Sequence, residues 1–204
     1  MVRSPTTLVD ELVGHYRRLE GVRKKWEKLY FSKVLPRYQI ELAYTSLYLD
    51  AVVTFERFVE TLFVGYLSRR FRLPNGSFVR VYINSDTVAR EVVLGGNSYV
   101  DWLPYERYTS KRAKAFFRNG KPFASLSKDE LKILQEVLTI RNAIAHKSKH
   151  ALRMFEQDVI GGLALVGRER TPAGYLRSQF RAAPAQTRYE NLMFELATIS
   201  SKLT

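Results

Sequence analysis

A long apolar stripe constrains the fold of this chain more than any other feature. Large apolar side chains recur at three- and four-residue steps between about Tyr38 and Arg70: Ile40, Tyr44, Leu47, Ala51, Phe55, Phe58, Leu62 and Tyr66. This spacing predicts one helix of roughly 30 residues, about 45 Å long, with a single buried face. Because such a rod must bury that face against other helices, we expect a helical hairpin or bundle with this helix as its spine.

Three further helices are marked by the same periodicity and by their first residues. One is expected over residues 7–30. The second, over residues 127–147 or continuing through Phe155, and the third, from Thr187 onward, each open with a capping box, in which Ser or Thr is followed three residues later by Glu. The fold class is therefore mainly all-α, a bundle with long antiparallel helices.

Residues 72–126 are less regular. Val79–Ile83 alternates like a short strand, and short helices are expected near Asp86–Leu94 and Pro104–Phe117. We expect this segment to be an irregular insertion on the bundle, so that residues 1–204 form a single domain.

Charge and composition narrow the classes of function. The chain has 33 Lys and Arg against 20 Asp and Glu, a net charge of +13, and it contains no cysteine. A polyanion partner is expected, nucleic acid before an anionic membrane surface. Disulfides, a thiolate nucleophile and zinc fingers are excluded. No apolar run reaches the roughly 20 residues that span a membrane and no signal peptide is visible, so we expect a cytoplasmic protein without a membrane partner.

Arg141 does not fit the stripe of its helix. With Leu131 set at zero and about 100° per residue, Arg141 lies at about 280°, near the centre of the apolar arc. That arc comprises Leu134, Val137, Leu138, Ile140, Ile144 and Ala145, and the opposite side carries Lys132, Gln135, Glu136 and Thr139. A buried guanidinium must be paired. It is either a structural ion pair, with Glu41 or Glu56, or an anion site at an interface.

Asn142 and His146 lie one turn apart on the polar margin of the same helix. Asn142 is placed to fix the tautomer of the imidazole. His146 is about 140° from Arg141 around the axis, so the two point different ways. A simply solvated His146 is the alternative.

The run Ile140-Arg-Asn-Ala-Ile-Ala-His-Lys-Ser148 resembles the signature of the HEPN superfamily. That signature is Arg, a polar residue, a few more residues and then His, late in a bundle helix. The resemblance covers about 20 residues around the motif and is looser over the two main helices. It does not extend to residues 72–126 or 163–186.

The resemblance implies a HEPN-like bundle and a metal-independent endoribonuclease, often a toxin or an antiviral defence effector. It implies a homodimer whose motif helices meet around one composite cleft. Carried over, His146 is the general acid/base, Arg141 holds the scissile phosphate, and Asn142 orients the His or contacts the phosphate. The products would be a 2′,3′-cyclic phosphate and a 5′-hydroxyl. Histidine suits proton transfer near neutral pH, and arginine suits charge stabilisation on phosphorus.

One position departs from a branch of the family. HEPN toxins paired with nucleotidyltransferase antitoxins carry a modified Tyr two residues after the His, where this chain has Ser148. We therefore do not expect that form of neutralisation, although an antitoxin or another regulatory protein remains a candidate partner.

Basic residues gather beside the motif and in two runs, residues 17–37 and 107–121, and these groups favour RNA as the partner. Lys147 and Lys149 flank the motif, and Lys111 and Arg112 belong to a second run with interleaved aromatic residues. The cations would neutralise phosphates and the aromatics would stack on unpaired bases. The second run comprises Arg107, Lys111, Arg112, Lys114, Arg118 and Lys121, with Tyr105, Tyr108, Phe116 and Phe117. An eight-residue basic cluster between Arg17 and Arg37, which includes Arg23, is a further candidate for RNA contact. A solvated face with core aromatics is the alternative.

Neither a metal nor a cofactor is expected. His146 and His150 are four residues apart but lack a third ligand nearby. The alternative function is a non-catalytic HEPN module that binds RNA or scaffolds a partner protein, with Arg141 in an internal ion pair. A helical DNA-binding protein is a third possibility, but the sequence shows no helix-turn-helix.

Overall fold

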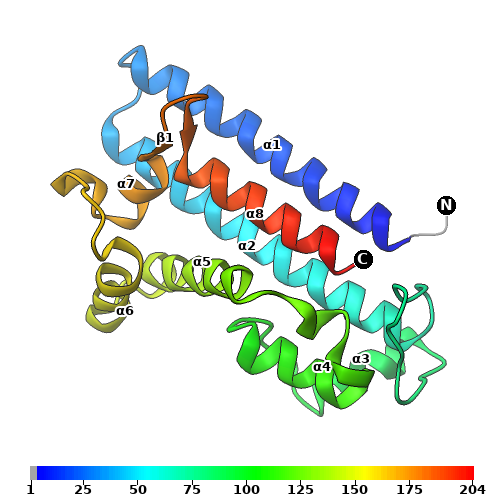
Figure 1. Cartoon of the computed structure of the whole chain (residues 1–204). Coiled ribbons are helices and arrows are strands. Elements are labelled where there is room, and N and C mark those ends of the chain that lie inside the picture. The colour runs from blue at the N-terminus through cyan, green and yellow to red at the C-terminus, as the bar shows by residue number, and fades with distance from the viewer. Residues whose placement is uncertain (1–3) are drawn as a thin grey trace. The chain divides into compact units, whose positions relative to one another are not determined.

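The computed structural model describes residues 4–204 and is mainly helical, which confirms the all-α class. Eight α-helices occur in this range: α1 Pro5–Phe31, α2 Arg37–Leu67, α3 Asp86–Leu94, α4 Lys111–Phe116, α5 Lys128–His146, α6 Lys149–Phe155, α7 Pro172–Arg177 and α8 Arg188–Lys202. Two single π-type turns, Glu106–Ser110 and Glu156–Ile160, and three short 3₁₀ turns connect them, together with a hairpin of β1 Gln179–Arg181 and β2 Gln186–Thr187 (Figure 1).

Two compact units divide the described chain. The motif unit comprises Gly14–Val53 and Glu136–Glu195, and it carries Arg141 and His146. The insertion unit comprises Thr54–Gln135, Leu196–Thr204 and the described residues up to Val13. The irregular segment 72–126 lies entirely in the insertion unit.

In the motif unit, α1 and α2 run antiparallel. The Tyr16 hydroxyl donates to the Ala51 carbonyl at 3.4 Å, and Arg23 Nη1 donates to the Tyr44 hydroxyl at 2.8 Å. From the first contact to the second, the chain advances seven residues along α1 and goes back seven residues along α2, as antiparallel helices require. The predicted stripe of α2 is buried here at Ile40, Tyr44 and Ala51, as its spacing requires.

The second half of α1 departs from its predicted stripe. Val22 and Leu29 each expose 41% of their surface, whereas Arg23 is 6% exposed. In this half of α1 the buried face therefore includes Arg23, a charged residue that is not part of the predicted apolar stripe. Arg23 is tolerated there because carboxylates and a hydroxyl take its donors.

Aromatic rings form the core of the insertion unit. Phe63, near the end of α2, lies 4.9 Å from the ring centre of Phe123, 5.0 Å from Phe117 and 5.3 Å from Trp102. The short helices expected in this region are present as α3 and as the π-type turn Glu106–Ser110 followed by α4. The strand expected at Val79–Ile83 is wrong, because Val79 forms only an isolated bridge with Phe117.

Helix α5 is capped at both ends. At its start the Ser127 and Glu130 side chains bond each other's backbone N–H groups at 3.3 and 2.8 Å, which confirms the capping box. At its end Lys147 adopts φ +49°, and the Ser148 hydroxyl accepts the Ala151 N–H at 3.1 Å to open α6. A left-handed residue stops an α-helix, so α5 does not continue through Phe155.

The predicted exposures along α5 are partly wrong. Thr139, expected in solvent, is 5% exposed, and Ala145, expected in the buried arc, is exposed. Glu136, also expected in solvent, is half-buried and accepts a 2.6 Å hydrogen bond from the Tyr175 hydroxyl. Burial raises the pKa of its carboxyl, although the hydrogen bond from Tyr175 and the charge of Arg188 oppose the rise.

No helix between residues 4 and 204 combines the length and the apolar character needed to cross a membrane.

Candidate functional site

Arg141 lies in the last two turns of α5 and is only partly buried. Its Nη1 donates a 3.1 Å hydrogen bond to the side-chain oxygen of the adjacent Asn142. The helical arc had placed Arg141 at the centre of the buried face, where Ile140 and Ile144 are indeed buried. Arg141 itself is only of intermediate burial, as is common for arginine, whose stem can pack on apolar surface while its head group stays in contact with water.

Arg141 does not form the ion pair with Glu41, one of the two expected acids, because Glu41 accepts a 2.5 Å bond from Arg37 Nε instead. Within the described motif unit, no carboxylate lies within ion-pair distance of the Arg141 guanidinium. In that unit only one of its five N–H donors is used, by the bond to Asn142.

His146 is the last residue of α5 and is exposed. It follows Arg141 by five residues, which places it about 7.5 Å further along the axis and about 140° around it. The two side chains of one subunit therefore leave the helix in different directions. Asn142 faces Arg141 in this structure, and none of the described hydrogen bonds joins its amide to His146.

The segment after His146 is rich in exposed cations. These are Lys147, Lys149 and Arg153, and Arg153 Nη2 lies 3.3 Å from Nδ1 of the exposed His150. The turn at Lys147 and the new helix that follows keep these side chains near the end of α5. A phosphate chain that passed this end would meet several positive charges.

Lys111 and Arg112 belong to α4, in the insertion unit. Lys111 is exposed, but the half-buried Arg112 lies 4.9 Å over the ring of Trp102 and donates to the Asp101 carbonyl at 3.2 Å. Burial lowers the pKa of the Arg112 guanidinium, and Asp101 opposes this shift. Arg112 therefore has structural contacts of its own.

Two of the aromatic residues proposed to stack on RNA bases are core residues. Tyr105 is 3% exposed and Phe117 is fully buried. A base cannot reach either ring, so the prediction of stacking is wrong for both. Tyr108 and Phe116 are half-buried. The alternation of basic and aromatic residues here reflects one face in the core and one in water.

Arg23, in the first basic cluster, is also committed to the interior. Its Nε and Nη2 each donate to Glu20 at 2.6 Å, and Nη2 donates to Glu190 at 2.9 Å. The Tyr44 hydroxyl, which accepts from Arg23, donates to Glu27 at 2.8 Å. Arg23 is therefore not an RNA-binding residue. The nearby acids Glu20 and Glu27 were the sequence signal for this network.

Metal ligands do not gather in the described chain, where no group of three or more His, Asp or Glu side chains is placed to hold an ion.

Comparison with protein-family models, curated proteins and solved structures gave no match. The functional argument therefore rests on the residues and their geometry.

Proposed function

We propose that this protein is a HEPN-like, metal-independent endoribonuclease that works as a homodimer. In this proposal Arg141 of one subunit and His146 of the other act on the same phosphodiester. Its bundle would then be the HEPN type of helical bundle. A role as a toxin or an antiviral defence effector is the cellular context that fits such an activity.

The observation that carries the proposal is the state of Arg141. Arg141 is partly exposed, and its guanidinium lacks a carboxylate partner within the described motif unit. A structural arginine would be paired, as Arg23 is with Glu20 and Glu190. An arginine with spare donors on a surface with further cations is suited to bind phosphate, because its planar fork matches two phosphate oxygens.

The proposed cleavage needs only the side chains of Arg141 and His146 and the 2′-hydroxyl of the RNA. The 2′-oxygen of the ribose attacks phosphorus while His146 accepts its proton. The bond from phosphorus to the 5′-oxygen then breaks, and the imidazolium returns a proton to the departing oxygen. Arg141 balances the negative charge that accumulates on the two other phosphoryl oxygens. The strand is cut into a 2′,3′-cyclic phosphate and a 5′-hydroxyl end, without a metal.

The helix geometry supports a dimer. Within one chain the two side chains diverge by about 140°, so they cannot both approach one phosphate easily. Two copies of α5 that meet near their C-terminal ends would bring Arg141 of each toward His146 of the other. Such a two-fold contact is the commonest form of self-association.

The test is cleavage of a single-stranded RNA in the presence of EDTA. We expect the wild type to cut and His146→Ala to lose at least about 100-fold in rate, as removal of a general acid/base does. His150→Ala is the matched control, because His150 is also exposed and is the second residue of α6. RNA with a 2′-deoxy residue at the cut position should resist cleavage.

Equal rates for His146→Ala and the wild type would refute the assignment of His146. If the dimeric wild type binds RNA and never cuts it, the non-catalytic module is the better description. One observation favours that alternative: Asn142 receives its bond from Arg141 and does not hold the imidazole.

A further inference from the structure

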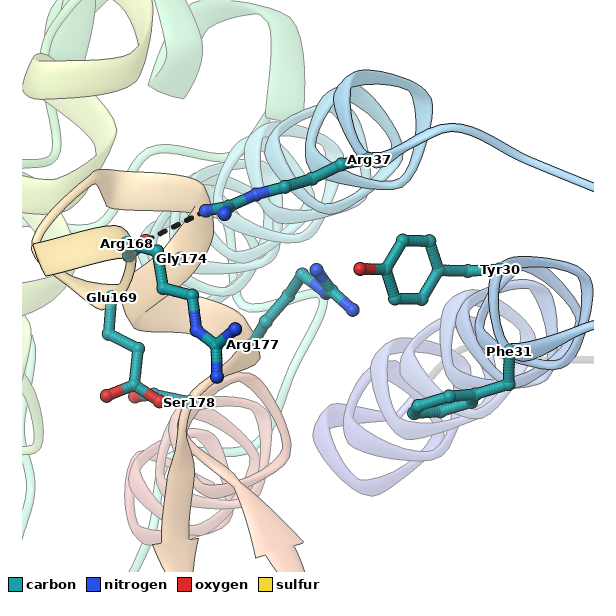
Figure 2. Close-up of a pocket in the computed structure, with 8 residues that line it drawn as sticks. All are labelled: Tyr30, Phe31, Arg37, Arg168, Glu169, Gly174, Arg177 and Ser178. Atoms are coloured by element: carbon teal, nitrogen blue, oxygen red, sulfur yellow. Dashed lines mark hydrogen bonds between the residues drawn. The ribbon is translucent and has the colours of Figure 1, made fainter. Parts of the chain in front are cut away.

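A cavity of about 310 Å³ opens in the motif unit, away from the residues of the HEPN-like motif. It lies between the end of α1, the start of α2 and the segment Gly167–Ser178, and we call it the arginine pocket. Its lining includes three arginines, Arg37, Arg168 and Arg177, and two aromatic residues, Tyr30 and Phe31 (Figure 2). The volume is at the lower end of the range for small-molecule sites, which is about 300–1,000 Å³.

Two of the arginines are held in place by contacts behind the pocket. Arg177 donates from Nε and Nη2 to Glu27 at 3.1 and 3.3 Å, and its guanidinium lies 4.5 Å from the centre of the Tyr30 ring. Arg37 donates to Glu41 at 2.5 Å and to the Arg168 carbonyl at 3.2 Å. Figure 2 shows Arg177 pointing toward Tyr30 and Arg37 reaching the Arg168 backbone. These two guanidinium groups are pre-positioned, so a ligand would not have to order them.

Arg168 differs from the other two. It is exposed, and in the described chain its guanidinium has neither an ion pair nor a hydrogen bond. Its carbonyl oxygen lies close to Gly174 of α7, where a Cβ would overlap it, and accepts the hydrogen bond from Arg37. The pocket thus presents one unpaired guanidinium.

The charged and aromatic side chains of the pocket indicate which class of ligand it could bind. Arg177 is paired with Glu27 and Arg37 with Glu41. Two charged side chains of the lining remain: Arg168, and Glu169, whose carboxylate accepts the Val166 N–H at 3.2 Å. Arginine forks of this kind recognise phosphate. Phe31, at the rim, leaves 75% of its surface exposed, and Tyr30 meets it edge to face at 5.8 Å between ring centres. An exposed ring beside a phosphate site is the arrangement that stacks on a nucleobase.

We propose that the arginine pocket binds a nucleotide, with its phosphate held by Arg168 and Arg177 and its base against Phe31. The nucleotide is either a free mononucleotide or one residue of an RNA strand, since both present the same chemistry. The site is independent of the proposed nuclease, because it uses neither Arg141 nor His146.

Isothermal titration calorimetry of the full chain with the four nucleoside 5′-monophosphates tests the free-ligand arm. Inorganic phosphate and the uncharged nucleosides are the comparison probes. We expect Arg168→Ala to weaken nucleotide binding at least tenfold. Phe31→Ala should weaken the nucleotide and leave the affinity for inorganic phosphate unchanged. Arg181→Ala removes the same charge from an exposed site on β1 outside the pocket lining and should bind like the wild type.

The RNA arm uses a five-nucleotide 2′-O-methyl RNA, which cannot be cut through its 2′-oxygen. Loss of its binding in Arg168→Ala and Phe31→Ala, without mononucleotide binding by the wild type, would assign the pocket to an RNA strand. The proposal is overturned if Arg168→Ala changes neither affinity, or if phosphate alone binds as tightly as the nucleotides. Binding should persist in His146→Ala, so failure of the nuclease proposal leaves this test intact.

Discussion

Arg23 Nη1 donates a 2.8 Å hydrogen bond to the hydroxyl of Tyr44 and so ties α1 to α2 inside the motif unit. The same guanidinium is held by Glu20 and Glu190, which brings α8 into the network. Burial tends to lower the pKa of Arg23, but the hydrogen bonds that it donates to Glu20 and Tyr44, together with their negative charge, outweigh burial and raise that pKa. The cation is therefore charged at every accessible pH, and its role is to satisfy buried acids.

Arg23→Ala should lower the free energy of unfolding by about 3 kcal/mol, because it leaves partly buried carboxylates and the Tyr44 hydroxyl without their donor. Arg17→Ala, on the exposed face of the same helix, should change it by less than about 0.5 kcal/mol. Urea unfolding followed by circular dichroism compares the two. Equal effects would show that Arg23 is only another surface cation.

A mixture of two inactive variants tests the composite site. Arg141→Ala and His146→Ala should each be inactive, but in a mixed dimer the intact Arg141 and the intact His146 come from different subunits and meet in one site. About half of the dimers are mixed at equilibrium, and in each mixed dimer one of the two sites has both residues intact. About one quarter of the wild-type rate should therefore return. The rate is measured after co-refolding of equal amounts. No recovery would place both residues of a site in the same chain.

The cations that follow His146 should contribute to RNA affinity through phosphate contacts. Replacing both Lys147 and Lys149 by Ala should reduce the slope of log affinity against log salt by about 1.4, since each contact with a single strand contributes about 0.7. The measurement is fluorescence anisotropy with a non-cleavable RNA at several salt concentrations. Lys128→Ala with Lys132→Ala removes two exposed charges from the first turns of α5 and is the control. An equal loss in both double variants would mean that net charge alone determines binding.

Glu130 should make stability depend on pH in the acid range. Burial tends to raise the pKa of its carboxyl, but hydrogen bonds from Lys202 and Ser127 outweigh burial and leave that pKa below its usual value. A group whose pKa is lower in the folded state stabilises the fold above its unfolded pKa, near 4.5, and this contribution is lost as the pH falls through the folded pKa. Glu130→Gln should therefore unfold about 1 kcal/mol more easily at pH 7 and match the wild type near pH 2.

Asp129→Asn is the control for the pH dependence of Glu130. Asp129 is the preceding residue, and its side chain is 89% exposed beside Lys132. The free energy of unfolding of the Asp129→Asn variant should stay close to that of the wild type at pH 7 and near pH 2, since exposed ion pairs contribute little. A difference between Glu130→Gln and wild type that persists at pH 2 would assign the effect to packing and not to charge.

Local sequence determined the helices and their ends. The stripe of α2, the capping boxes at Ser127 and Thr187 and the irregular character of residues 72–126 all depend on neighbours within a few residues, and all are present in the structure. The hairpin β1–β2 was not predicted, because its strands have only three and two residues and provide no periodicity.

Tertiary structure decided which arginine is buried. The helical arc predicted burial for Arg141, and the basic run predicted solvent for Arg23; the structure leaves Arg141 only partly buried and buries Arg23. Periodicity gives the direction in which a residue leaves its helix. Whether a long charged side chain is then buried or exposed depends on acids from distant segments, such as Glu190 for Arg23. The arginine pocket was invisible for the same reason, since Arg37, Arg168 and Arg177 converge from three elements. The sequence thus determined the helices and the Arg141–His146 spacing, whereas only the packing of distant segments decided which cations remain free to bind an anion.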